Sequence, residues 1–125
     1  MNIVLWVLQV LLAAAFLAHG LIMLFPPSDV LAQMASMPTA FRIFLGVAEV
    51  LAALGLTLPG ITRILPWLVS GAAAGLMVVM ISATIFHIAR GEVSGAAVTA
   101  VLFLMATFVA YMRWKVLPIL PRPAA

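Results

Sequence analysis

The chain contains no cysteine and little charge of either sign. Its 125 residues include six Lys and Arg, three Asp and Glu, and two His. The lack of cysteine excludes disulfide frameworks, thiolate metal ligands and any thiol–disulfide relay. Charged residues make up 7% of the chain, against about 25% in soluble domains. This composition excludes an ordinary soluble fold.

Apolar residues take the place of the missing charge. Hydrophobic side chains make up 67% of the chain, and its mean hydropathy is +1.34. This composition indicates an integral membrane protein. For a chain of 125 residues we expect a single transmembrane domain over residues 1–125.

Prolines and charges divide the apolar sequence into four segments. We predict membrane-spanning helices over residues of about 2–25, 41–58, 66–89 and 93–113. At a rise of 1.5 Å per residue these helices are about 27 to 36 Å long, which is enough to cross a bilayer. The fold class is therefore all-α, an integral membrane four-helix bundle. The first segment lacks an N-terminal Lys or Arg, so we expect a retained helix rather than a cleaved signal peptide.

The connection between the first two spans predicts a short interfacial helix over Ser28–Met37. Pro26-Pro27 precede it and Pro38 follows it. An amphipathic helix of this kind lies in the headgroup plane of the membrane. It is either a simple connector or a lid over the residues beneath it.

The six basic residues predict the orientation of the chain. Four of them lie near the side that holds both termini, namely Arg63, Arg113, Lys115 and Arg122, while Arg42 and Arg90 lie on the other side. The excess favours both termini in the cytoplasm of a multi-pass protein of the cell (inner) membrane. The expected partner of these cations is the lipid bilayer, and no nucleic acid is expected.

Five polar side chains form the candidate ligand-binding site: Glu49, His19, His87, Arg42 and Arg90. Glu49 lies within an apolar span, where a carboxylate costs roughly 2.5 to 3.5 kcal/mol and needs a partner, a proton or a function. Counting from the span ends places these residues in the same half of the bundle, and we expect the other half to lack polar groups. The alternative is a structural Glu49 that only holds helices together.

Two histidines and a carboxylate also raise the question of a metal or haem site. We expect no metal and no haem, because His19 and His87 differ in depth by roughly 6 Å and no helix carries a paired histidine motif.

Small residues predict where the helices approach each other. Gly71 and Gly75 form a GxxxG pattern on the third span, and Ala48 and Ala52 lie along the second. We expect these residues to pack against neighbouring helices of the same chain. The alternative is a homodimer seam through the two glycines.

Several short segments, taken in order, resemble a known family. They are Phe16-Leu17-Ala18, Leu24-Phe25-Pro26-Pro27, Gly46-Val47-Ala48-Glu49-Val50-Leu51, Gly55-Leu56-Thr57-Leu58-Pro59-Gly60, Phe86-His87 and Arg90-Gly91-Glu92. The chain resembles the DoxX-like family of small four-helix bacterial membrane proteins. The resemblance implies a compact bundle in which Glu49 occupies a recurrent polar position. Relatives often carry a Lys where this chain has Met23, so either His19 replaces that Lys as the partner of Glu49 or Glu49 is protonated.

The resemblance leaves three functions open. Some relatives look like quinone-linked oxidoreductase subunits, which implies binding of a lipid, a quinone or another small apolar molecule around Glu49. Quinone is then the one cofactor to consider, with a further oxidoreductase subunit or a second copy of the chain as partner. The alternatives are a non-enzymatic scaffold or assembly factor, and a proton-coupled transporter that uses Glu49. No residue of the sequence decides whether the protein is an enzyme.

Overall fold

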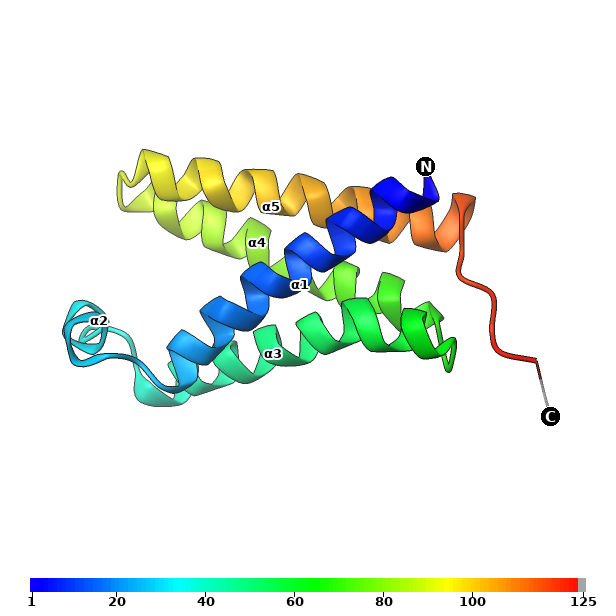
Figure 1. Cartoon of the computed structure of the whole chain (residues 1–125). Helices are drawn as coiled ribbons and strands as arrows, with labels where there is room; N and C mark the ends of the chain where they lie inside the picture. The colour runs from blue at the N-terminus through cyan, green and yellow to red at the C-terminus, as the bar shows by residue number, and fades with distance from the viewer. Residues whose placement is uncertain (124–125) are drawn as a thin grey trace.

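The computed structural model describes residues 1–123, and within them the regular structure is entirely helical. The elements are α1 (Asn2–Leu24), α2 (Ser28–Gln33), α3 (Thr39–Thr62), α4 (Trp67–Ala89), α5 (Val93–Tyr111) and a π-helical turn, η1 (Met112–Val116) (Figure 1). Four helices, the last running through η1, are long and apolar enough to cross a membrane. The predicted all-α membrane bundle is confirmed.

The four long helices form two pairs. Helix α1 packs along α3, α4 packs along α5, and the α3–α4 contact joins the pairs. The N-terminus, η1 and the α3–α4 turn lie at one end of the bundle, here named the terminal end. Helix α2 and the α4–α5 turn lie at the other, the α2 end (Figure 1). The pairs converge at the terminal end and diverge towards the α2 end (Figure 1).

The buried residues of α4 and α5 are distributed in accordance with this divergence of the helix pairs. On α4 the buried residues are Val69, Ala73, Leu76 and Met80, and on α5 they are Ala106 and Val109. All of them lie in the half of each helix towards the terminal end or near its middle. The hydrophobic core is therefore concentrated there, and the α2-end halves of α4 and α5 remain unpacked against α1 and α3.

Two elements end at other residues than the sequence predicts. Helix α3 continues through Pro59 to Thr62, and Gly60, the residue after the proline, packs closely against other parts of the chain. A Cβ at Gly60 would lie 2.8 Å from the Trp6 ring and 2.9 Å from Ile119. Helix α2 ends at Gln33 rather than Met37, and the segment that follows turns towards Pro38, which disfavours helical backbone in the residue before it.

Helices α1 and α3 approach each other closely at two glycines, Gly20 and Gly46, which the sequence pattern alone did not single out. A Cβ added at Gly20 would lie 3.0 Å from the Gly46 carbonyl oxygen, and one at Gly46 would lie 3.0 Å from the Gly20 carbonyl oxygen. Helices α1 and α3 therefore touch backbone to backbone. Gly71 and Gly75, by contrast, have open space at the Cβ position. The expectation that these two glycines pack closely against another helix of the chain is wrong for the described residues, because the α3–α4 contact runs beside them through Gly55 and Ala72.

Candidate functional site

Glu49 and His19 are brought together by the α1–α3 crossing. Gly46 precedes Glu49 by one helical turn, and Gly20 follows His19, so the glycine contact carries both side chains to the same point. His19 Nδ1 lies 2.7 Å from Glu49 Oε2. The side chain of Glu49 is 4% exposed and that of His19 is 59% exposed. The carboxylate is thus buried in the bundle, while its partner remains open.

One proton is shared between His19 Nδ1 and Glu49 Oε2, and the other ring nitrogen, Nε2, can still form a hydrogen bond with a ligand. Either the imidazole donates Nδ1–H to the carboxylate, or a carboxylic acid donates O–H to Nδ1. The other ring nitrogen, Nε2, forms no hydrogen bond within residues 1–123. A ligand carbonyl or hydroxyl that approached the exposed ring would find a donor or an acceptor already held in place by Glu49.

Glu49 also borders a groove between α3 and α4. The groove has a volume of about 500 Å³. Its walls are Ala48, Glu49, Leu51, Ala52 and Gly55 from α3, and Leu68, Ala72, Gly75, Leu76 and Val79 from α4. Apart from Glu49 these residues are apolar, and five of them are Ala or Gly. These small residues are predicted to bring helices together, but here their short side chains leave the groove open between α3 and α4.

Arg42 does not pair with Glu49. It lies two turns before Glu49 on α3 and donates a hydrogen bond from its guanidinium to the backbone carbonyl of Met23. No ion pair within residues 1–123 involves Arg42. The seven-residue spacing places both residues on one helix face, but the end of α1 lies nearer to the guanidinium and takes its hydrogen bond.

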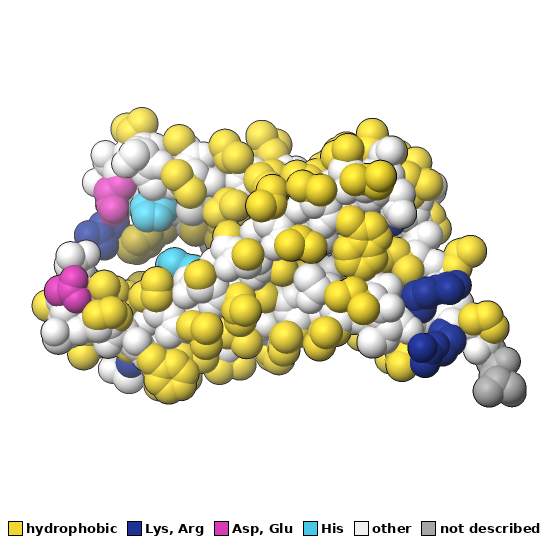
Figure 2. Space-filling model, viewed as in Figure 1, with side chains coloured by type: hydrophobic (Ala, Val, Ile, Leu, Met, Phe, Trp, Pro, Cys, Tyr) yellow, Lys and Arg dark blue, Asp and Glu magenta, His cyan; other side chains and the backbone are white. Residues whose placement is uncertain are grey.

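His87 and Arg90 form a separate group around Glu92. Arg90 Nε lies 2.8 Å from Glu92 Oε1, and His87 Nδ1 lies 3.5 Å from Glu92 Oε2. The His87 ring packs directly against Gly95, because a Cβ at that position would lie only 2.7 Å from Nδ1. This group is held on the α4–α5 turn. Histidine side chains, coloured cyan, lie on both sides of the hollow between the two helix pairs (Figure 2).

The comparisons with known proteins identify the family. The DoxX-like family matches residues 7–109. This chain belongs to the DoxX-like family. None of the curated proteins and none of the solved structures compared with it matches.

The family match covers 103 of the 125 residues of this DoxX-like protein (109 − 7 + 1) and includes every candidate ligand-binding residue. It stops before Arg113, which is 4% exposed, whereas the sequence predicts a cation that faces the lipid headgroups. Arg113 Nε donates to Gln9 Oε1 at 2.7 Å, and its Nη1 donates to Asn2 Oδ1 at 2.7 Å. Gln9, fully buried, donates in turn to the Leu56 carbonyl at 2.8 Å.

The expectation that this half of the DoxX-like bundle lacks polar groups is therefore wrong. Gln9 accepts from Arg113 Nε on one side and donates to the α3 backbone on the other, so a charge and an amide are buried together. Arg113 also lies over the Trp6 ring, 5.5 Å from its centroid. One feature of the sequence indicates this network. Gln9 is an isolated amide on an apolar helix, and it lies at the same depth as Arg113, the basic residue at the end of the fourth span.

No group of three or more His, Cys, Asp and Glu side chains within residues 1–123 is arranged to hold a metal ion. The five residues predicted as one site thus belong to three places in this DoxX-like protein: the Glu49–His19 pair, Arg42 on its own, and the group around Glu92. The first of these combines burial, a free ring nitrogen and an adjoining apolar groove.

Proposed function

We propose that the Glu49–His19 pair binds the polar group of a neutral amphipathic molecule, a quinone or a lipid, whose apolar body lies in the α3–α4 groove. The observation that carries this proposal is that Glu49 belongs both to the hydrogen-bonded pair and to the wall of the groove. The polar group and the apolar body of one molecule can thus both bind next to Glu49.

The chemistry of the pair supports a carbonyl or hydroxyl as the ligand group. His19 is fixed through Nδ1 by Glu49, so its Nε2 is pre-oriented and loses little freedom on binding. A hydrogen bond formed in an apolar environment is electrostatically stronger than one in water, and removal of one partner leaves a buried polar group unsatisfied. When Nε2 carries the proton, a quinone carbonyl or a lipid ester is the matching acceptor, and when Nε2 is unprotonated, a ligand hydroxyl is the matching donor.

The groove supports an apolar body of moderate size. Its volume of about 500 Å³ lies within the range of roughly 300 to 1,000 Å³ that is common for small-molecule sites. From Leu68 to Val79 it runs along α4 for eleven residue steps, which is about 16 Å at a rise of 1.5 Å per residue. Two or three isoprenoid units or a segment of an acyl chain fit that length.

We further propose that the protein acts in the cell (inner) membrane as a subunit of an oxidoreductase system, with both termini in the cytoplasm. The implied relation of some DoxX-like proteins to quinone-linked enzymes supports the first part. The distribution of Lys and Arg supports the second, since Arg63, Lys115 and Arg122 all lie at the terminal end. A partner subunit would exchange electrons with the bound quinone.

The proposal is tested by purification in mild detergent, followed by solvent extraction, an absorption spectrum and native mass spectrometry. We expect the wild-type protein to carry a quinone or neutral lipid that Glu49→Gln loses. Glu92→Gln is the matched control, because it removes a carboxylate from the α4–α5 turn, away from the groove. A wild-type protein without any such adduct, or equal retention by Glu49→Gln, contradicts the proposal.

A further inference from the structure

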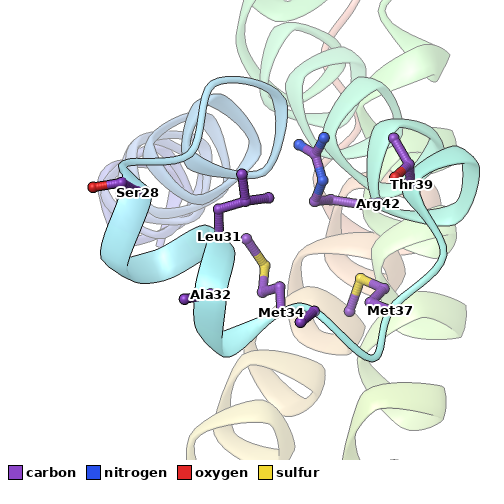
Figure 3. Close-up of a pocket in the computed structure, with 8 residues that line it drawn as sticks. Ser28, Leu31, Ala32, Met34, Met37, Thr39 and Arg42 are labelled. Atoms are coloured by element: carbon purple, nitrogen blue, oxygen red, sulfur yellow. The ribbon is translucent and has the colours of Figure 1, made fainter.

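A second cavity lies between α2 and the first turns of α3 (Figure 3). Its volume is about 420 Å³. The residues that line it are Ser28, Leu31, Ala32, Met34, Ala35, Met37, Thr39 and Arg42. Leu31 and Met34 extend from the α2 side towards Arg42, which stands opposite them on α3 (Figure 3). The cavity therefore has mostly apolar walls and one positive charge.

The charge of Arg42 is not neutralised within residues 1–123. A guanidinium has five N–H donors, and the one hydrogen bond that Arg42 makes is to an uncharged acceptor, the Met23 carbonyl. Two of the three carboxylates in the chain are already engaged, Glu49 with His19 and Glu92 with Arg90. Asp29 forms no ion pair with any residue from 1 to 123 and does not line the cavity.

Helix α2 leaves this cavity unfilled because it does not pack on the bundle. None of its residues is buried, and it forms no extensive contact with another helix. Its position, at the end of two membrane-spanning helices and between two proline-bounded turns, is that of an interfacial segment at headgroup level. At that level a membrane supplies phosphate groups and acyl chains together.

We propose that this cavity binds an anionic phospholipid. The phosphate pairs with the Arg42 guanidinium, whose planar fork of N–H donors matches the geometry of phosphate oxygens. Ser28 and Thr39 also line the same space. The first carbons of the acyl chains lie against Leu31 and Met34. This ligand is charged and sits about two helical turns from Glu49, so the site is separate from the one proposed for a neutral molecule.

The test is lipid retention measured by native mass spectrometry. The protein is exchanged into detergent with equal amounts of phosphatidylglycerol and phosphatidylcholine of the same acyl chains, with and without excess inorganic phosphate. We expect about fivefold preferential retention of phosphatidylglycerol, from the roughly 1 kcal/mol that one basic residue contributes near an anionic membrane surface. Arg42→Gln should abolish the preference, and Arg42→Lys should keep most of it. Excess inorganic phosphate should leave it unchanged.

Two further variants separate the cavity from a general effect of charge. Arg90→Gln removes a cation at the same end of the bundle that already pairs with Glu92, and it should leave the preference intact. Leu31→Trp fills the cavity while keeping Arg42, and it should lower retention of phosphatidylglycerol. Equal retention of the two lipids by the wild type overturns the proposal. So does a preference that survives both Arg42→Gln and Leu31→Trp, or one that phosphate removes.

Discussion

At the scale of single residues, the Glu49–His19 pair stands out because its members differ so much in exposure. Glu49 is buried and satisfied by a partner in its own chain, so the carboxylate needs no ligand to remain in the membrane. His19 is more than half exposed and has a second ring nitrogen without a hydrogen bond among the described residues. Burial explains the retention of Glu49, and exposure makes His19 the residue that meets a ligand.

The pair should show a measurable coupling energy. His19→Ala leaves the Glu49 carboxyl group buried without a partner, and Glu49→Ala leaves His19 without its acceptor. Because the two effects share one hydrogen bond, the double variant should be more stable than the sum of the single losses predicts. We expect a coupling of about 0.6 to 2 kcal/mol, the range for hydrogen bonds between membrane helices. Thermal unfolding in detergent measures it, and additive losses would show that the bond contributes nothing.

The hydrogen bond between Gln9 and Arg113 leads to a second prediction, which concerns stability. Gln9→Leu removes the acceptor of Arg113 Nε, and an unsatisfied buried donor costs about 1 to 3 kcal/mol or more when it is charged. The double variant Gln9→Leu with Arg113→Met replaces the polar group by apolar side chains. It should recover most of the lost stability, because the buried charge is gone. Unfolding midpoints of the two variants in one detergent test this, and a double variant less stable than Gln9→Leu would contradict it.

At the scale of helices, the α1–α3 crossing depends on Gly20 and Gly46. Gly46→Ala places a Cβ 3.0 Å from the Gly20 carbonyl and 2.7 Å from Leu24, so it should cost about 1 to 3 kcal/mol through overpacking. Thermal unfolding in detergent measures this loss, and a stable Gly46→Ala variant would contradict the contact.

Gly71→Ala is the matched control, because a Cβ there meets nothing within 4 Å. Alanine in a helix interior is favoured over glycine by about 0.5 to 1 kcal/mol, so this variant should be stabilised. A destabilised Gly71→Ala protein would instead indicate that another copy of the chain covers that face.

The difference between the two glycine pairs shows what the sequence could and could not predict. The existence and number of the membrane helices follow from composition and breakers alone, and the structure confirms them. Which small residues touch depends on the crossing of helices, and the GxxxG pattern at Gly71 and Gly75 carried no information on that. In the same way Glu49 and His19 were identified as unusual residues, whereas the hydrogen bond of Arg42 to Met23 depends on where α1 ends. Gln9 was missed because a single amide is common and only its position beneath Arg113 makes it important.

At the scale of the whole molecule, the fold fixes which segments share a side of the membrane. Ser36 and Ser94 belong to the α2 end, and Thr62 belongs to the terminal end. Since the chain has no cysteine, single-cysteine variants at these positions can be labelled without background. A membrane-impermeant maleimide should label Ser36→Cys and Ser94→Cys in intact cells, and Thr62→Cys only after permeabilisation. The reverse pattern would contradict the proposed orientation, and labelling of all three from one side would contradict the arrangement of the helices.

The divergence of the two helix pairs gives the molecule a packed half and an open half. The core and the Arg113 network hold the terminal end together, while the α2 end contains the hollow flanked by histidine side chains (Figure 2). A bundle built this way can keep its fold while a ligand enters at one end. Glu49 lies near the middle of α3, and its groove runs from there towards the terminal end, because the α4 wall extends from Leu68 to Val79.

The most direct test of this account is the affinity of a short-chain quinone for the purified protein, measured by calorimetric titration. Glu49→Gln replaces the group that fixes the His19 ring for its ligand, so the loss of about 1.4 kcal/mol expected for one hydrogen bond should raise the Kd about tenfold. Glu92→Gln should bind as the wild type does. An equal Kd for Glu49→Gln and the wild type, or no binding by either, would contradict the central claim that Glu49 and His19 hold a ligand.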